Sequence, residues 1–267
     1  MKLLTYIHDP DDLYIPLIKN TKFPKLIDKN TVIAISKTTT KNVKNLIPKL
    51  GFTQIEGGKY GTARINLLKY ANSNKLKGPF LLCDFDKLIH WINTNKEEFI
   101  ETFKYEPKAD LTVIARSARA LSTYPETWTS TEEIATRVLA KIIRKKVDFM
   151  NGPLILNEKA SKIIAKNAKN TGVGSCAEFC LITNNANLLI DNLEVDGLTW
   201  EDPDRYTTMI KASKNYEDWK YNTYHSLYEW RKRILFLENQ IKSMIELSNE
   251  PINPKYPIVH NKTIETT

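Results

Sequence analysis

Two aspartates, Asp84 and Asp86, end an apolar run in the segment GPFLLCDFD (78–86). Successive side chains of a β-strand point to opposite faces, so two carboxylates at this spacing in a strand would point the same way. A hard divalent cation such as Mg²⁺ or Mn²⁺ takes one or two carboxylates and completes its shell with substrate phosphates. The run before the pair is apolar enough for a strand that is buried on both faces. The pair therefore predicts a metal site at the end of that strand.

A helix cap is the alternative interpretation of this pair. Aspartate is a favoured N-cap residue, and a helical pattern begins at Lys87. A cap needs only one carboxylate, whereas a metal site uses both and accounts for the buried strand that presents them. We therefore favour the metal.

The elements around the pair predict an α/β fold. Helical patterns alternate with strand-like runs, which are TVIAIS (31–36), TQIEGG (53–58), PFLLCDFD (79–86) and ADLTVIARSA (109–118). Such alternation favours a mainly parallel sheet with helices on both faces, and sheets of this kind bind ligands at the carboxyl ends of their strands. A helix is also expected to start at Ser130, because Glu133 three residues later completes a capping box.

The second half of the chain predicts more helix than strand. Helices are expected at about 157–169 and 176–185, with a short β-segment near 193–196. From Tyr216 to Met244 apolar residues recur every three or four positions, which predicts one long amphipathic helix. We therefore divide the chain into a domain over 1–210 and a C-terminal extension over 211–267 that consists of this helix and an extended tail.

In order and spacing, these motifs resemble the nucleotide-diphospho-sugar glycosyltransferases of the GT-A fold. The resemblance covers about residues 31–200 and rests on TVIAIS, TQIEGG, GTARINLLKYA and GPFLLCDFD in that order. It implies a GT-A-like, Rossmann-like sheet and the transfer of a sugar from a nucleotide-diphosphate donor to an unknown acceptor, for which a saccharide and a lipid-linked molecule are both compatible. It also implies that Asp84 and Asp86 hold Mg²⁺ or Mn²⁺ against the donor diphosphate. The metal would stabilise the charge on the departing nucleoside diphosphate.

Three arginines are candidate ligands of the donor, together with Asp84. By the resemblance, Arg64 in the helix before the metal strand would lie near the nucleotide or its phosphates; a surface arginine is the alternative. Arg116 and Arg119 follow the strand LTVIA, where two guanidinium groups could bind a phosphate or an acidic sugar. Ion pairs on a solvated turn would explain either of these two equally well.

Two further residues are candidates by their place in the chain. Glu178 follows TGVGSCA at the start of an otherwise apolar helix, and by the resemblance it is the candidate catalytic acid of the second half. A helix N-terminus also favours a carboxylate for electrostatic reasons alone. His260, in the tail PIVHNKT, is the candidate third metal ligand by the same resemblance.

Composition restricts the partners only loosely. Lys and Arg number 39 against 31 Asp and Glu, which gives a net charge of +8 that is spread along the chain. This suits an anionic partner, whether a nucleotide, an anionic lipid or a nucleic acid. The three cysteines include no C-x-x-C pair, as expected in a reducing cytoplasm. The N-terminal MKLLTYIHDPDD is interrupted by polar residues too early for a signal peptide, so a cytoplasmic location is expected, with peripheral contact at the inner membrane surface left open.

Other function classes stay open at this point. A metal-dependent phosphatase or nucleotidyltransferase could use the same aspartates. A basic protein without catalysis could bind nucleic acid or a membrane surface through the late helix, which could also form a homodimer. The sequence contains no Walker A loop, no G-x-S-x-G and no H-E-x-x-H, so it gives no support to P-loop, serine-hydrolase or zincin chemistry.

Overall fold

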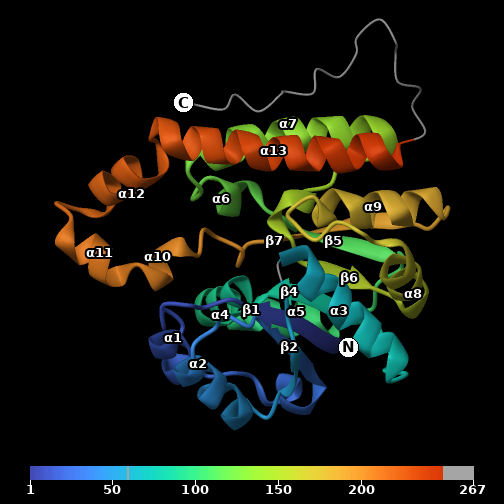
Figure 1. The fold of residues 1–267 in the computed structure, drawn as a ribbon, viewed down its shortest axis with the longest axis horizontal. Helices are drawn as coiled ribbons and strands as arrows, with labels where there is room; N and C mark the ends of the chain where they lie inside the picture. Colours follow the sequence, from blue (N-terminus) through green and yellow to red (C-terminus); the bar gives the residue numbers. More distant parts are fainter. Residues whose placement is uncertain (59, 249–267) are drawn as a thin grey trace, which may run out of the picture.

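A computed structural model describes residues 1–58 and 60–248. A seven-stranded sheet runs through the molecule in the order β3-β2-β1-β4-β6-β5-β7 (Figure 1). Its strands are β1 (Lys2–Ile7), β2 (Thr31–Ile35), β3 (Thr53–Glu56), β4 (Phe80–Asp84), β5 (Leu111–Arg116), β6 (Leu154–Leu156) and β7 (Ile190–Val195). β6 runs antiparallel to β4 and β5, and the other pairs are parallel. The predicted mainly parallel α/β sheet is confirmed.

The central strand β1 was not predicted from the sequence. It lies between β2 and β4 and pairs with both in parallel. Its apolar residues Leu3, Leu4 and Ile7 are buried. Strands of five or six residues are ordinary in sheets, so KLLTYI is long enough, although its pattern before a polar segment is too short to stand out. As a result, the first βα unit of the fold begins near residue 2.

Helices cover both faces of the sheet. They are α1 (Ile15–Asn20), α2 (Lys41–Leu46), α3 (Tyr60–Ser73), α4 (Phe85–Thr94), α5 (Lys96–Lys104), α6 (Ala118–Leu121), α7 (Glu126–Ile143), α8 (Glu158–Asn167) and α9 (Ser175–Asn185), followed by α10 (Asp202–Arg205), α11 (Thr207–Ala212), α12 (Tyr216–Tyr224) and α13 (Leu227–Leu247). Short 3₁₀ turns occupy Lys25–Asn30, Ile47–Leu50 and Phe149–Asn151. Along β4, Phe80 and Leu82 join the core beneath α3 and α9, while Leu81 and Cys83 join the core beneath α4 and α5. This alternation is what burial on both faces requires.

The junction of β4 and α4 corrects the strand argument for the aspartate pair. Asp84 is the last residue of β4, and α4 begins at Phe85, so Asp86 lies in the first turn of a helix. The two carboxylates therefore do not alternate along one strand. The helix-cap alternative also fails in part, because Asp84 occupies the N-cap position but its side chain makes no capping hydrogen bond.

Two predicted helix ends are wrong. The capping box at Ser130 does not start a helix, because α7 begins at Glu126 behind Pro125 and Ser130 lies inside it. The predicted long helix from Tyr216 is two helices, α12 and α13, because the helix is interrupted at His225 and Ser226. The Ser226 hydroxyl accepts a hydrogen bond from the Glu229 N–H and so caps the start of α13.

The C-terminal helix α13 lies beside α7 along one side of the molecule, while α10, α11 and α12 form an arm that extends from the body (Figure 1). α13 also packs against α9. Its buried residue Met244 belongs to the main core. The domain boundary predicted at residue 210 falls within α11. Within the described ranges, no helix is both long and apolar enough to cross a membrane.

Candidate functional site

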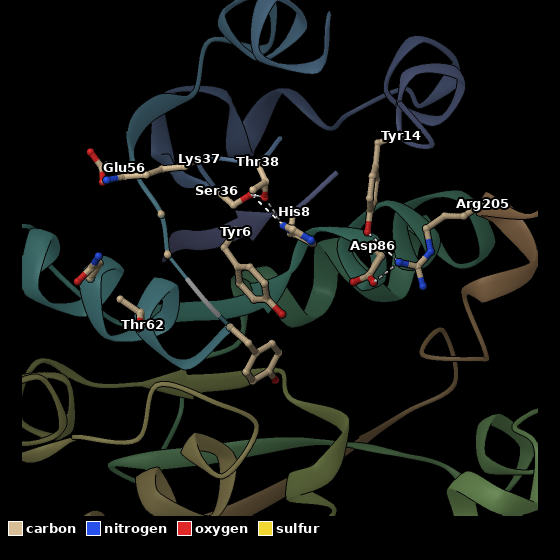
Figure 2. Close-up of a pocket in the computed structure, with 14 residues that line it drawn as sticks. Tyr6, His8, Tyr14, Ser36, Lys37, Thr38, Glu56, Thr62, Asp86 and Arg205 are labelled. Atoms are coloured by element: carbon tan, nitrogen blue, oxygen red, sulfur yellow. Dashed lines mark hydrogen bonds and ion pairs between the residues drawn. The ribbon is translucent and has the colours of Figure 1, made fainter. Parts of the chain in front are cut away.

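A cavity of about 820 Å³ opens at the carboxyl ends of β1, β2 and β3 (Figure 2). We call it the first cavity. Parallel strands end at the same edge of a sheet, and so His8 after β1, Ser36 after β2 and Gly57 after β3 all line it. Asp86 and Arg205 lie at its far side. The chain thus presents side chains from four separate segments to one space.

The floor of the first cavity is polar and closely packed. His8 Nδ1 lies 2.9 Å from the Ser36 hydroxyl, and the Thr38 hydroxyl lies 3.1 Å from the same nitrogen. The Gly57 N–H donates to the Ile35 carbonyl at 2.7 Å. A Cβ at Gly57 would lie 2.8 Å from the Ile35 carbonyl carbon, so this approach of two backbone segments requires glycine. The result is a groove with hydrogen-bonding side chains on a closely packed backbone floor.

Asp84 lies behind this floor in a pair with Arg64. Arg64, on α3, is fully buried, and its Nη1 lies 3.3 Å from Asp84 Oδ1. The same guanidinium donates to the Tyr60 hydroxyl at 2.9 Å and to the Gly152 carbonyl at 2.6 Å. The structure therefore excludes the surface-arginine alternative for Arg64 and places it beside the metal candidate.

The ionisation of Asp84 depends on its surroundings. Burial raises the pKa of Asp84, the Arg64 guanidinium lowers it and the charge of Asp86 raises it, and the net result is a pKa of about 6. A carboxylate held near the middle of the physiological range is typical of ligand-binding and catalytic sites.

Asp86 pairs with Arg205 from α10. The distance from Arg205 Nη1 to Asp86 Oδ2 is 3.3 Å (Figure 2). Arg205 also donates to the Tyr14 hydroxyl at 3.2 Å and forms an ion pair with Asp202. Arg205 was not identified as a site residue from the sequence. The segment WEDPDRY (200–206) held the signal, an aromatic residue beside four charged ones, but turn chemistry explained it as well.

A second cavity, about 300 Å³, lies on the other side of Asp84 and Asp86. Tyr6, Tyr60, Asp86 and Arg205 line both cavities. The rings of Tyr6 and Tyr60 meet edge to face with centroids 5.3 Å apart, which forms a wall between the two spaces. Asp86 is therefore at the junction of the two cavities, and Asp84 lines the second one.

Arg116 lies in the second cavity, whereas Arg119 does not line either one. Arg116 is buried and bonds Asp148 through Nε at 2.8 Å and Nη2 at 2.7 Å. Its Nη2 also lies 2.7 Å from Glu132, which was not predicted to be a site residue. Arg119 is exposed and pairs with Asp196 at 3.3 Å, as the solvated-turn alternative expects. The two arginines thus diverge although only two residues separate them.

Glu178 lies in a different pocket from the aspartates, with Asn167, Ser243 and Glu246. Its carboxylate accepts the backbone N–H of Lys169 at 2.7 Å and of Asn170 at 3.0 Å. This geometry gives Glu178 a part in holding the turn before α9. A catalytic role for Glu178 stays a sequence-based prediction. His260 lies outside the described residues.

The two aspartates fit a hard divalent cation as a partial ligand set. Across residues 1–58 and 60–248, no group of three or more His, Cys, Asp or Glu side chains could hold a metal. Mg²⁺ and Mn²⁺ sites that are completed by phosphate and water need only one or two carboxylates. Asp84 and Asp86 provide these next to the larger cavity, which leaves room for the remaining ligands.

Solved structures share this fold. Glucosyl-3-phosphoglycerate synthase from Mycobacterium tuberculosis in complex with Mn²⁺, UDP and glucosyl-3-phosphoglycerate aligns with a TM-score of 0.57 at 9% identity, over 94% of this chain and 81% of that one. The same synthase with Mn²⁺, UDP-glucose and glycerol 3-phosphate aligns with a TM-score of 0.53 at 10% identity, over the same shares. A structure described only as a mycobacterial protein aligns with a TM-score of 0.57 at 12% identity, over 94% and 75%. No family model matches the sequence, and no curated protein matches it. The similarity confirms the GT-A-like α/β fold.

Proposed function

We propose that this protein is a metal-dependent glycosyltransferase that moves a sugar from a nucleotide-diphosphate donor to an acceptor hydroxyl. The observation that carries the proposal is the position of Asp84 and Asp86 between two cavities at the carboxyl edge of a parallel sheet. Ligands of open α/β sheets bind at this edge. The similar synthase was solved in complex with Mn²⁺ and UDP, or with Mn²⁺ and UDP-glucose, which supports the proposal.

The first cavity is the proposed site of the donor nucleotide. Its volume of about 820 Å³ lies within the range of small-molecule and cofactor sites. His8, Ser36 and Thr38 offer hydrogen bonds to a base or a ribose, and the Gly57 and Gly58 backbone permits close approach by a ring. Because Asp86 and Arg205 are at one end of this cavity, the diphosphate is expected at that end.

The diphosphate end of the site combines carboxylates and guanidinium groups from this chain. Asp84 and Asp86 would hold Mg²⁺ or Mn²⁺, which when bound neutralises the charge that develops on the leaving nucleoside diphosphate. Arg64 keeps Asp84 in place through its bonds to Asp84, Tyr60 and Gly152. Arg205 lines both cavities and so adds a positive charge beside the bond that breaks. In this scheme the acceptor hydroxyl attacks the anomeric carbon from the second cavity.

Thermal unfolding with nucleotides and metal tests the proposal. UDP, GDP, ADP and CDP are each tested with and without Mn²⁺, and one of them is expected to raise Tm only when the metal is present. Asp84→Asn and Asp86→Asn should remove the joint effect and leave the fold intact, while Arg119→Ala, at an exposed arginine outside both cavities, should keep it. Joint stabilisation that survives in both aspartate variants would refute the site, and none with any nucleotide would refute the function.

A further inference from the structure

The second cavity contains charged groups that balance one another. The cations among its lining residues are Lys87, Arg116, Arg205 and Arg233, and the anions are Asp84, Asp86, Glu132 and Glu201. Four positive charges thus face four negative ones. A bound donor would keep this balance, because a divalent metal on the aspartates adds two positive charges and a diphosphate diester adds two negative ones. The cavity presents no excess charge to a ligand.

Each of the four cations is already paired with a carboxylate. Lys87 Nζ lies 2.8 Å from Glu201, and Arg233 Nη2 lies 2.5 Å from Glu132. Glu132 also holds Arg116, and Arg205 pairs with Asp86. A phosphate on Lys87, Arg116 or Arg233 would have to displace a buried carboxylate, Glu201 or Glu132, and leave it without a partner, which is strongly unfavourable. This cavity therefore disfavours an anionic ligand.

Two buried lining residues nevertheless keep polar atoms without a partner in the described structure. Arg233 is 5% exposed and its Nε makes no hydrogen bond, and Asn151 is 2% exposed and its Oδ1 accepts none. Buried polar atoms in folded proteins nearly always have partners, so these two residues keep unused hydrogen-bonding capacity beside the cavity. One is a donor and the other an acceptor, and a hydroxyl can satisfy either.

Aromatic rings complete the wall. Tyr124, Trp128 and Phe236 line the same cavity, with the Arg233 guanidinium 4.1 Å from the Trp128 ring centre and 5.2 Å from that of Phe236. Rings with a few fixed polar groups suit a ligand that has apolar faces and polar edges. Sugar rings have both.

We propose that the second cavity binds a neutral, polyhydroxylated acceptor of the saccharide class. This inference rests on the proposed function and specifies its acceptor. It separates this chain from the similar synthase, whose complex with Mn²⁺ and UDP-glucose also contains glycerol 3-phosphate. In this assignment the hydroxyls of the acceptor lie beside Arg233 and Asn151, and its ring faces lie against the aromatic wall.

Saturation-transfer NMR on the full chain tests the inference. The protein is first saturated with Mg²⁺, which is diamagnetic, and with whichever nucleotide binds in the thermal assay. The neutral probes are the methyl glycosides of glucose, mannose and galactose, and the anionic probes are 3-phosphoglycerate and glycerol 3-phosphate. At least one glycoside is expected to receive saturation, and neither phosphate ester is. Binding of the phosphate esters alone, or of no probe at all while nucleotide and metal bind, would overturn the inference without affecting the proposed function.

Matched variants place the binding in the second cavity. Asn151→Leu should weaken glycoside binding roughly tenfold, the scale of a lost buried hydrogen bond. Asn192→Leu is the control, because Asn192 on β7 also has an unpartnered Oδ1 but lines neither cavity. Equal weakening in the two variants would overturn the assignment.

Glu201→Gln gives a second readout, which does not depend on how well Asn151→Leu folds. The substitution leaves Lys87 without its carboxylate, so 3-phosphoglycerate should gain measurable binding. If 3-phosphoglycerate already binds the wild-type chain equally well, charge balance does not set the acceptor class.

Discussion

Arg64 and Asp84 show how single residues set up the candidate site. The Arg64 side chain is fully buried, and three groups from α3, β4 and the turn before β6 accept its hydrogen bonds. Burying a guanidinium is costly, and only pairing with a carboxylate and further hydrogen bonds offsets the cost. The pair is therefore coupled in both stability and ionisation.

Arg64→Met should destabilise the protein by about 3–5 kcal/mol, because it leaves the Asp84 carboxylate and the Gly152 carbonyl buried without their partner. Urea unfolding of the variant and the wild type measures the change. Arg119→Met is the matched control: its ion pair is solvent-exposed, and its loss should cost at most about 1 kcal/mol. Similar costs for the two variants would contradict the role given to Arg64.

The pKa of Asp84 predicts a pH dependence of metal binding. Because the pKa is about 6, a proton competes with the metal below that pH, and affinity for Mn²⁺ should fall roughly tenfold per pH unit.

The stability of the metal-free protein depends on pH in the opposite direction, since Asp84 stabilises the fold more at low pH than at high pH. The folded state binds the Asp84 proton more tightly than the unfolded chain, whose ordinary value is 3.8, so this group's contribution falls as pH rises from about 4 to about 6. Calorimetric titration of Mn²⁺ with nucleotide between pH 5 and pH 7.5, about the expected midpoint, measures the effect; a flat profile would exclude Asp84 as a ligand.

Among the secondary-structure elements, α3 begins at a tight contact with the backbone of another segment. A Cβ on Gly61 would lie 2.3 Å from the Asn170 carbonyl oxygen, and the Gly61 N–H donates to the Thr171 carbonyl at 3.0 Å. Both neighbouring groups are backbone and cannot move alone. The start of α3 is therefore fixed against the loop before α9, and with it Tyr60 and Arg64.

Gly61→Ala should destabilise the protein by about 1–3 kcal/mol through overpacking and should weaken nucleotide and metal binding as the start of α3 shifts. Chemical denaturation and the thermal assay measure the two effects. Gly172→Ala is the control, since its Cβ would meet only the Asn170 side chain at an ordinary 3.5 Å. An unchanged Gly61→Ala protein would show that α3 is not held in this way.

The sequence predicted the elements with strong patterns and missed those that tertiary contacts decide. β2, β5 and α3 have long apolar or helical runs and were placed correctly, and β4 was placed correctly except at its end. β1 was missed because its six residues become recognisable as a central strand only through pairing with β2 and β4. Asp86 was placed on a strand because the apolar run before it does not reveal that a helix begins at Phe85.

At the scale of the whole molecule, the site joins two halves of the chain. β1, β2, β3 and α3 form the first cavity, whereas the second draws on α7, α9 and α13. The sequence could predict Asp84 and Asp86 because they follow one strand directly. Lys87, Glu132, Arg205 and Arg233 could not be predicted, because their pairing joins distant segments, as Lys87 and Glu201, 114 positions apart, show. Contact of α13 with a second copy or a membrane surface stays a prediction.

The most direct test of the account is the binding of Mn²⁺ in the presence of nucleotide, followed by electron paramagnetic resonance of the free ion. The wild-type chain with the stabilising nucleoside diphosphate should bind Mn²⁺. Asp84→Asn and Asp86→Asn should each weaken that binding by about tenfold or more, as expected when a carboxylate ligand is lost. Binding of the same strength in both variants would contradict the claim that these two aspartates form the metal site.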